Sequence, residues 1–461
     1  MLTAFHLDSK AFRATTSHVA KEENKFTVIV GKNGTGKSRI LKAIVETFVN
    51  PDAVERSRSD DLRLHPAPFL RLEYDYQPSS VIAISTSPFD RFPLPESRRG
   101  FTDRIGLNDS RYPSYEYLGL RGLFSRNLSL SFMSRTITSL IESVYDNAEH
   151  AQQICNVLNY LKYDGSLEAT FQLSFSIGKL NEILAKDDPA SFLRDYIFSK
   201  RDGFRVSSLF MHAGPESIDR LIYALRRFLS ALRRPRIDIK IDRGGVASLN
   251  HADLSIDKDF VILLELGFLR LREVSLKKLG SDKRIHLNEA SSGEQSVVMG
   301  FLGIAAHIGD GSLICVDEPE ICLHPEWQER YIQLLISTFR AFKRCHFVIA
   351  THSPQIVSRL EQENCFVLNV ESGETIDAKE LIKKSSDFQL ANTFGAPGYK
   401  NEYLSRELIT LLTHFSKSGT FSKEQTDLAC KLLTLKPLLD ESDPVGQLMS
   451  MLEEILAERT Q

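Results

Sequence analysis

The segment from Gly31 to Ser38 restricts the possible folds of this chain more than any other part of its sequence. It reads Gly-Lys-Asn-Gly-Thr-Gly-Lys-Ser, and it follows the apolar, β-branched run Phe26–Val30. A helical pattern of apolar residues then continues to Phe48. A strand, a loop of the form GxxxxGK[ST] and a helix in this order are typical of a phosphate-binding loop. The sequence therefore predicts an α/β domain whose first helix begins at such a loop.

The residue types of this loop suit ATP with Mg²⁺. Glycines let the backbone wrap around phosphates with its N–H groups turned inward. Lys37 supplies a positive charge to the β and γ phosphates, Ser38 is predicted to ligate Mg²⁺, and the helix N-terminus favours anions. The nucleotide-binding residues predicted here are Gly31, Asn33, Gly34, Thr35, Gly36, Lys37 and Ser38.

Two carboxylates directly follow the apolar run Leu313–Val316. Asp317 is predicted to hold the Mg²⁺ shell, and Glu318 to orient or deprotonate the attacking water. Two acids after a strand can also form an ordinary surface turn. The phosphate-binding loop on the same chain favours the catalytic interpretation.

Two further segments fit the same site. The run Ser-Ser-Gly-Glu-Gln from 291 to 295 opens a predicted helix from Gly293 to His307, so Ser292 and Gly293 could bind a γ-phosphate. Read alone, the same run is an ordinary helix cap. His352 follows the buried run Phe347–Ala350, and it is either a structural histidine or a sensor of the γ-phosphate. The order of the motifs favours the functional interpretation of both.

Taken in this order, the motifs resemble those of ABC-type ATPases. The run Asp317–Pro325 is similar to the branch that contains the RecF, SMC and overcoming-lysogenisation-defect ATPases. The resemblance implies an ABC-type head in which two copies sandwich ATP head to tail, with residues 320–325 at the dimer contact. The catalytic residues that it implies are Lys37, Glu318 and His352. The residues that it implies to act on the partner's nucleotide are Ser292 and Gly293, and Glu294 is predicted to bind nucleotide as well.

Closer similarity is expected among bacterial anti-phage ATPases. A compact helical insertion, a short helical tail and the segment Phe394–Gly398 resemble PtuA, the ATPase subunit of the Septu system, which works with a separate HNH nuclease, PtuB. No Toprim or HNH pattern is found in the sequence, so we expect any nuclease, HNH or Toprim, to be a separate subunit. The alternatives are a RecF-like DNA-binding ATPase of repair or recombination, and the ATPase subunit of a toxin that acts on translation.

The alternation of strand and helix patterns predicts an α/β fold with a mixed or parallel sheet. The predicted segments are an ATPase lobe with the phosphate-binding loop (1–100), a mainly helical insertion (101–235), a second ATPase lobe with the remaining motifs (236–375) and a helical tail (376–461). Within them, Phe260–Leu264 is predicted to be a strand and Pro93–Tyr117 an irregular connection.

Composition and charge exclude several other classes of protein. The formal net charge is −3, so any nucleic-acid surface must be local. No signal peptide is visible, and no uncharged apolar run approaches the roughly 20 residues that span a bilayer. The 6 cysteines form no CxxC pair and are expected to be buried free thiols. We therefore expect a cytoplasmic protein without a membrane partner.

Two features leave alternatives open. The predicted helix from Ile218 to Arg234 carries an arginine every seven residues from Arg220 to Arg234. It could bind a DNA backbone, or it could form a solvated face or a subunit contact paired with acids. No glutamine stands where ABC-type ATPases place their Mg²⁺-sensing loop. The segment Ser85–Asp90 occupies that place, and the sensor is unassigned.

Overall fold

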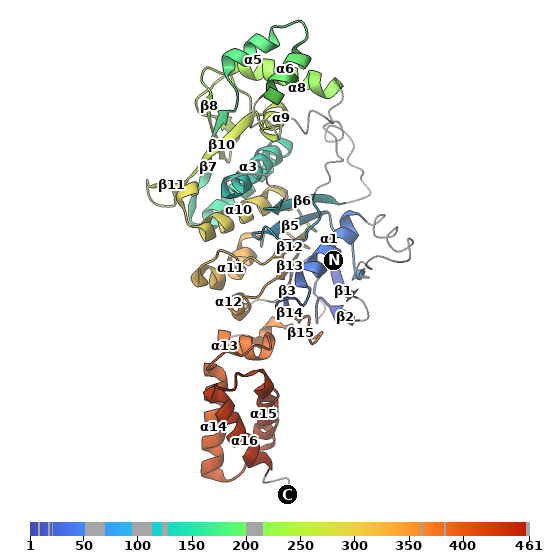
Figure 1. Ribbon diagram of the computed structural model, residues 1–461, viewed down its shortest axis with the longest axis vertical. Helices are drawn as coiled ribbons and strands as arrows, with labels where there is room; N and C mark the ends of the chain where they lie inside the picture. The colour runs from blue at the N-terminus through green and yellow to red at the C-terminus, as the bar shows by residue number, and fades with distance from the viewer. Residues whose placement is uncertain are drawn as a thin grey trace.

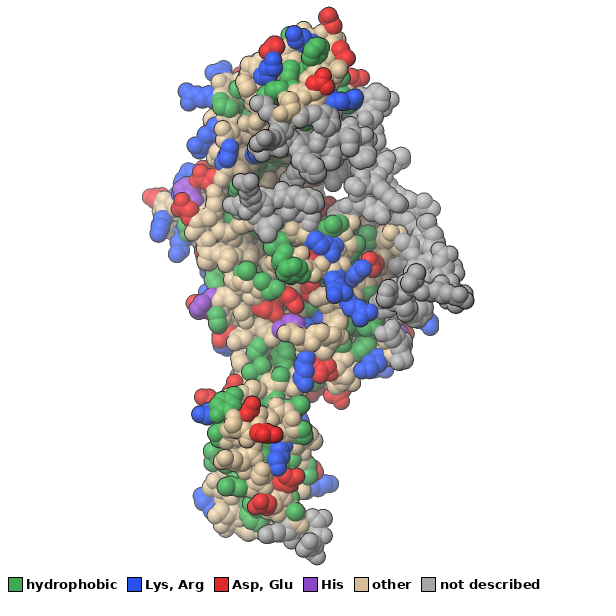
Figure 2. All heavy atoms as spheres, viewed as in Figure 1, with side chains coloured by type: hydrophobic (Ala, Val, Ile, Leu, Met, Phe, Trp, Pro, Cys, Tyr) green, Lys and Arg blue, Asp and Glu red, His purple; other side chains and the backbone are tan. Residues whose placement is uncertain are grey.

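The computed structural model describes residues 1–7, 10–16, 19–20, 22–50, 70–94, 113–121, 128–199, 215–360, 363–381 and 384–457. Its body is an α/β structure, with a second sheet and its helices at one end and a helical bundle at the other (Figure 1). Figure 2 shows basic and acidic side chains intermixed on the visible face of that bundle. No helix in the described ranges is long and apolar enough to cross a membrane.

The central sheet has seven strands in the order β15-β14-β3-β13-β12-β5-β6. All neighbouring strands are parallel except the edge pair of β14 and β15. The predicted α/β fold with a mixed sheet is therefore confirmed. The bounds of its strands are β3 Lys25–Val30, β5 Ser80–Ser85, β6 Ser114–Gly119, β12 Leu313–Asp317, β13 His346–Ala350, β14 Cys365–Asn369 and β15 Thr375–Asp377.

Helices cover both faces of this sheet because its strands are apolar on both sides. On one face, α1 (Lys37–Val49) packs against a core that also includes a small antiparallel sheet, β2-β1-β4. On the other face lie α10 (Ser292–His307) and α11 (Pro325–Thr338). Alternate residues of β12 divide between the two cores, with Cys315 on the α1 side and Val316 on the α10 side. The small sheet consists of β1 Leu2–Leu7, β2 Lys10–Arg13 and β4 Leu70–Tyr74.

A five-stranded antiparallel sheet, β11-β10-β7-β8-β9, carries the helices at the other end of the body (Figure 1). Its strands are β7 Tyr163–Leu173, β8 Arg236–Asp242, β9 Gly245–Ser248, β10 Leu269–Lys278 and β11 Arg284–His286. The helices around it are α3 Leu128–Asp146, α4 Glu149–Tyr160, α5 Ile177–Leu184, α6 Pro189–Ser199, α8 Pro215–Ala231 and α9 Lys258–Glu265. Strands from the predicted insertion and from the second lobe thus pair within one sheet.

The prediction of a strand at Phe260–Leu264 is wrong, because these residues belong to helix α9. Asp257 caps this helix by accepting hydrogen bonds from the N–H groups of Asp259 and Phe260. A short run that is apolar throughout fits a buried helix as well as a buried strand, and the cap decides between them. Residues 95–112 of the predicted connection Pro93–Tyr117 lie outside the part of the chain that the structure describes. Its end is also corrected, because Ser114 begins strand β6.

The C-terminal bundle has a hydrophobic core of its own. Its helices are α14 Glu402–Ser418, α15 Lys423–Leu433 and α16 Pro444–Ala457. Shorter helices in the chain are α12 Pro354–Ser358, α13 Ser386–Phe388, the π-helical turn Gln389–Thr393 and the 3-10 turns Leu287–Glu289, Ala378–Leu381 and Lys436–Leu438. All cysteines are free, and the expectation that they are buried is wrong for Cys322 and Cys430, which are exposed.

Candidate nucleotide-binding site

The loop after β3 has the backbone that a phosphate-binding loop requires. Gly34 and Gly36 have φ values of 84° and 94°, a region that side-chain-bearing residues rarely adopt. Gly36 caps helix α1, so Lys37 and Ser38 are the first residues of that helix. The first N–H groups of a helix have no acceptor within it, and they are available to an anion.

Parallel pairing brings the predicted motifs to one edge of the sheet. Ile29 of β3 pairs with Ala350 of β13, and Ala350 pairs in turn with Asp317 of β12. Asp317 also pairs with Ser85 of β5 on its other side. The phosphate-binding loop, the two acids and His352 therefore leave the carboxyl ends of neighbouring strands, where open α/β sheets bind their ligands.

Ser38 and Asp317 form the part of the site that could hold Mg²⁺. The Ser38 hydroxyl donates to Asp317 Oδ1 at 3.0 Å. Only 3% of Asp317 is exposed, and this burial raises the pKa of its carboxyl to about 7, while Ser38 acts in the opposite direction. A hydroxyl and a carboxylate side by side are oxygen ligands of the kind that Mg²⁺ takes together with phosphate oxygens and water. These residues fit the ion.

Lys37 and His352 meet above the strand ends. Lys37 Nζ donates to the carbonyls of Gly31 at 2.8 Å and Lys32 at 3.1 Å, and it lies 3.2 Å from His352 Nδ1. Burial lowers the pKa of Lys37, and burial together with the nearby Lys37 lowers the pKa of His352 to about 4. A neutral His352 accepts from Lys37 at Nδ1 and carries its proton on Nε2.

Glu318 is placed where it could act on water near the γ-phosphate. Its Oε1 lies 3.5 Å from His352 Nε2, and 29% of its side chain is exposed. Its φ is 50°, in the left-handed region, and its N–H donates to the carbonyl of Ala350 at 2.9 Å. Non-glycine residues in this region are often found at functional sites, where the surroundings hold them in place.

The structure adds a residue that the sequence analysis did not single out. Glu320 accepts hydrogen bonds from the backbone N–H of His352 and, at 2.8 Å, from the hydroxyl of Thr351. Its carboxylate therefore fixes the backbone of the predicted sensor. In the sequence, Glu320 is the second glutamate of the run Asp-Glu-Pro-Glu that begins at Asp317. The sequence analysis placed it only within the predicted dimer contact, residues 320–325.

The segment Ser291–Gln295 forms the first turn of α10. Ser291 caps the helix by accepting from the N–H of Glu294, and Ser292 is exposed. Gly293 is buried, and a Cβ placed there would lie 2.8 Å from the carbonyl oxygen of Cys322. Glu294 accepts from the Tyr163 hydroxyl at 2.6 Å, so its carboxylate is engaged within the same chain. Within the described ranges, no hydrogen bond joins this turn to the loop Gly31–Ser38, and the role of Ser292, Gly293 and Glu294 at a nucleotide stays a prediction.

The segment Ser85–Asp90, which occupies the place of the unassigned Mg²⁺-sensing loop, begins with hydroxyl side chains. The Thr86 hydroxyl donates to the carbonyl of Glu318 at 3.3 Å, and Ser85 lies beside Asp317 in the sheet. Asp90 is buried at the end of this segment and accepts from the Tyr117 hydroxyl at 2.6 Å. Arg121 donates to the backbone carbonyl of Asp90. The segment is thus anchored to β6 while its first residues contact the two acids.

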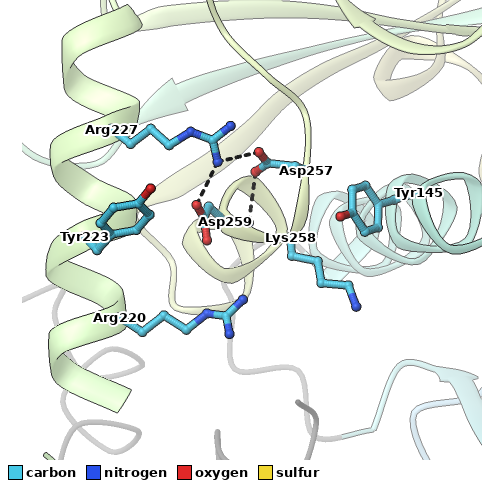
Figure 3. A pocket seen from close by; sticks show the side chains of 7 residues that line it. All are labelled: Tyr145, Arg220, Tyr223, Arg227, Asp257, Lys258 and Asp259. Atoms are coloured by element: carbon cyan, nitrogen blue, oxygen red, sulfur yellow. Dashed lines mark hydrogen bonds and ion pairs between the residues drawn. The ribbon is translucent and has the colours of Figure 1, made fainter. Parts of the chain in front are cut away.

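The predicted helix through Arg234 is too long, because α8 ends at Ala231 and Arg233 and Arg234 lie beyond it. Acidic side chains pair with part of the Arg220–Arg234 segment (Figure 3). Arg227 lies 2.7 Å from Asp257 and 3.0 Å from Asp259, and Arg233 lies 3.6 Å from Asp253. A hollow of about 460 Å³ lies beside Arg227. Its lining residues are Tyr145, Arg220, Tyr223, Arg227, Asp257, Lys258 and Asp259. Binding of DNA by the Arg220–Arg234 segment stays a prediction, and the ion pairs reduce the free charge on which it rests.

Together, the fold and this arrangement of Lys37, Asp317 and Glu318 are those of an ATPase with a phosphate-binding loop. A family model described as "AAA domain, putative AbiEii toxin, Type IV TA system" matches residues 184–358, which include Asp317 and His352 but not the phosphate-binding loop.

Similar curated proteins carry related names. The chain is 26% identical over 428 residues to "Retron Ec83 probable ATPase" of Escherichia coli, a match that covers 84% of this chain and 75% of that protein. It is 23% identical over 386 residues to "Retron Vc95 probable ATPase" of Vibrio cholerae, covering 75% and 69% respectively. Among solved structures, the Smc head domain bound to the C-terminal domain of ScpA, derived from Pyrococcus furiosus, aligns at 13% identity with a TM-score of 0.28, covering 82% of this chain and 95% of that one.

Proposed function

We propose that the protein binds and hydrolyses ATP as the ATPase subunit of an anti-phage defence complex, and that it works as an ATP-sandwiched dimer. The observation that carries the ATPase part is the cluster of Lys37, His352 and Glu318 above the Ser38–Asp317 pair. The defence role is supported by its similarity to proteins named retron ATPases.

The positions of the side chains support the following steps of hydrolysis. The oxygen of a water molecule forms a bond to the γ-phosphorus, and the bond from that phosphorus to the bridging oxygen of ADP breaks. Glu318 accepts the proton of the attacking water, and Lys37 leaves its backbone acceptors to bind the phosphates. Mg²⁺, held by Ser38 and Asp317, would supply charge neutralisation to the phosphates. His352, which touches both Lys37 and Glu318, is positioned to respond when the γ-phosphate is lost.

The dimer is proposed because Ser292 is exposed at the N-terminus of α10 while Gly293 is packed against Cys322. An exposed hydroxyl at a helix N-terminus suits the γ-phosphate bound by a second copy. Closing and opening of this dimer would control a separate nuclease subunit, of the HNH or Toprim kind, as in a PtuA-type arrangement.

A second candidate function is suggested by the description of the matching family model, which names a toxin of a toxin–antitoxin system. In that role the same ATPase cycle would drive toxicity to the host cell rather than protection from phage. The two candidates differ in what they predict for expression without infection: normal growth for the defence subunit, and growth arrest for the toxin.

The proposed function is tested by expressing the gene with its neighbours in a sensitive bacterial host. Phage plating is expected to fall with the wild-type gene and to return to the control level with Lys37→Ala and with Glu318→Gln. Full protection by Lys37→Ala would contradict an ATP-dependent defence role. Growth arrest without phage that depends on Lys37 would instead favour the toxin.

A further inference from the structure

We propose that Glu320 and Gln328 are positioning residues that join the sensor loop, residues 351–353 around His352, to the segment 320–325. They would thereby connect the subunit's own nucleotide site to the first turn of α10, which is proposed to contact the partner's nucleotide. This inference rests on the proposed ATP-hydrolysing dimer. Neither residue touches the phosphate-binding loop through a hydrogen bond in the described part of the chain.

Glu320 makes the first connection. Each of its carboxylate oxygens is used, one by the N–H of His352 and the other by the hydroxyl of Thr351. The same Thr351 hydroxyl accepts from the N–H of Ser353 at 3.0 Å. The residues on both sides of His352 are thus tied to one carboxylate, and His352 cannot shift its backbone without disturbing Glu320.

Gln328, on α11, makes the second connection. Its Oε1 accepts from the Ser353 hydroxyl at 2.7 Å, and its Nε2 donates to the carbonyl of Leu323 at 3.0 Å. The amide therefore bridges the far end of the sensor loop to the far end of the segment 320–325. With Glu320 at the near end, the two loops are joined at two places.

The segment 320–325 is compact enough to transmit a displacement. Its turns are closed by hydrogen bonds from the N–H of Ile321 to the carbonyl of Glu318 at 3.2 Å and from the N–H of Leu323 to the carbonyl of Glu320 at 2.9 Å. Cys322 has a φ of 69°, and its carbonyl packs directly against Gly293 at the start of α10.

A continuous set of contacts therefore runs from one functional end of the chain to the other. It begins at Lys37 and His352, passes through Glu320 and Gln328, and reaches Gly293 beside the exposed Ser292. When the γ-phosphate is lost beside His352, the segment 320–325 and the first turn of α10 are expected to move with the sensor loop. Each subunit would thereby report the state of its own nucleotide to the site that it completes for its partner.

The full-length protein is tested by ATP hydrolysis as a function of ATP concentration, together with binding of a fluorescent ATP analogue. The wild type is expected to have a Hill coefficient above 1. Glu320→Ala and Gln328→Ala are expected to lower kcat at least severalfold and to bring the Hill coefficient to 1, while the Kd for the analogue stays within about twofold of wild type. Glu320→Gln, which keeps one oxygen acceptor for His352, is expected to recover part of the lost kcat.

Glu329→Ala is the matched control, because Glu329 also lies on α11 but its carboxylate pairs with Arg359 at the end of α12. It is expected to behave as the wild type. Normal kcat and Hill coefficient in both Glu320→Ala and Gln328→Ala would overturn the inference, as would equal losses of kcat in Glu329→Ala. If either Glu320→Ala or Gln328→Ala fails to bind the analogue, its fold is lost, and the kcat and Hill coefficient of the remaining variant then test the inference. If the wild type itself neither hydrolyses ATP nor dimerises, the proposed function fails before this inference is reached.

Discussion

At the scale of single residues, the charged groups of the site are held by partners that a nucleotide would replace. Lys37 Nζ donates to two carbonyls of its own loop and to His352, and these are the groups it would exchange for phosphate oxygens. Asp317 lies at the end of an apolar strand, where burial makes a carboxylate costly without a cation. The site is therefore arranged for an anion and a cation together.

Lys37→Ala is expected to weaken ATP binding. A hydrogen bond to a charged group contributes about 1.5–3 kcal/mol, which corresponds to roughly 10- to 100-fold in Kd. Titration of a fluorescent ATP analogue measures the change. Lys42→Ala on the exposed side of α1, where Lys42 pairs with Glu46, is the control and should leave the affinity unchanged. Equal affinity of Lys37→Ala and the wild type would remove Lys37 from the nucleotide site.

Glu318→Gln is expected to bind ATP normally and to hydrolyse it at least about 100-fold more slowly, because general-base catalysis contributes typically 10²- to 10⁴-fold. Single-turnover hydrolysis of radiolabelled ATP checks this, with retention of ATP on the protein as the second readout. Rapid turnover by this variant would show that another group accepts the proton.

At the scale of helices and strands, the site could be predicted wherever chemistry and pattern coincide. The sequence predicts the phosphate-binding loop, and it predicts the buried strand that ends at the paired acids Asp317 and Glu318. Each of these features has its own residue types at a fixed spacing. Helix α9 could not be predicted, because the run Phe260–Leu264 is apolar throughout and has no periodicity that would distinguish a helix from a strand. Strand β7 was also missed, although its burial alternates over much of its length from Leu167 to Leu173. Glu320 could not be assigned, because its partners lie 31 and 32 residues away along the chain.

Gly293→Ala tests the contact between α10 and the segment 320–325. A Cβ there would lie 2.8 Å from a backbone oxygen, so we expect a loss of about 1–3 kcal/mol in the free energy of unfolding. Gly300→Ala on the same helix is the matched control, because nothing lies within 4 Å of its added Cβ. Alanine is favoured over glycine in a helix by about 1 kcal/mol, so this control should be stabilised. Denaturant unfolding compares the two, and stabilisation by both would refute the contact.

At the scale of the whole molecule, buried histidines make folding depend on pH. Burial lowers the pKa of His346 to about 3 and that of His307 to about 4. The Thr27 hydroxyl, which donates to the carbonyl of Ala14, lies 2.8 Å from His346 Nε2 and accepts the proton of the neutral ring. Both rings are neutral in the folded protein, whereas in the unfolded chain they take up protons below about pH 6.5.

The stability that these two neutral rings contribute is therefore expected to be fully present above about pH 6.5 and to fall as the pH decreases toward 4. Each histidine contributes a slope of about 1.4 kcal/mol per pH unit within that window. Urea unfolding between pH 7.5 and 5 measures it, and His346→Gln should have a shallower slope than the wild type. Because the raised pKa of Asp317 changes total stability in the opposite direction, the comparison of the two proteins decides, and equal slopes for His346→Gln and the wild type would contradict the burial of the His346 ring.

In the proposed dimer, two copies of the chain enclose ATP, with Lys37 of one copy and Ser292 of the other at the same nucleotide. The most direct test is the solution mass of the Glu318→Gln protein with ATP and Mg²⁺, by light scattering during gel filtration. We predict that the chain of 52.1 kDa doubles its mass only with ATP. Adding Ser292→Arg should return the mass to that of one chain while each chain still binds ATP. A mass of one chain with ATP in the Glu318→Gln protein, or an undiminished dimer after Ser292→Arg, would rule out the shared nucleotide site.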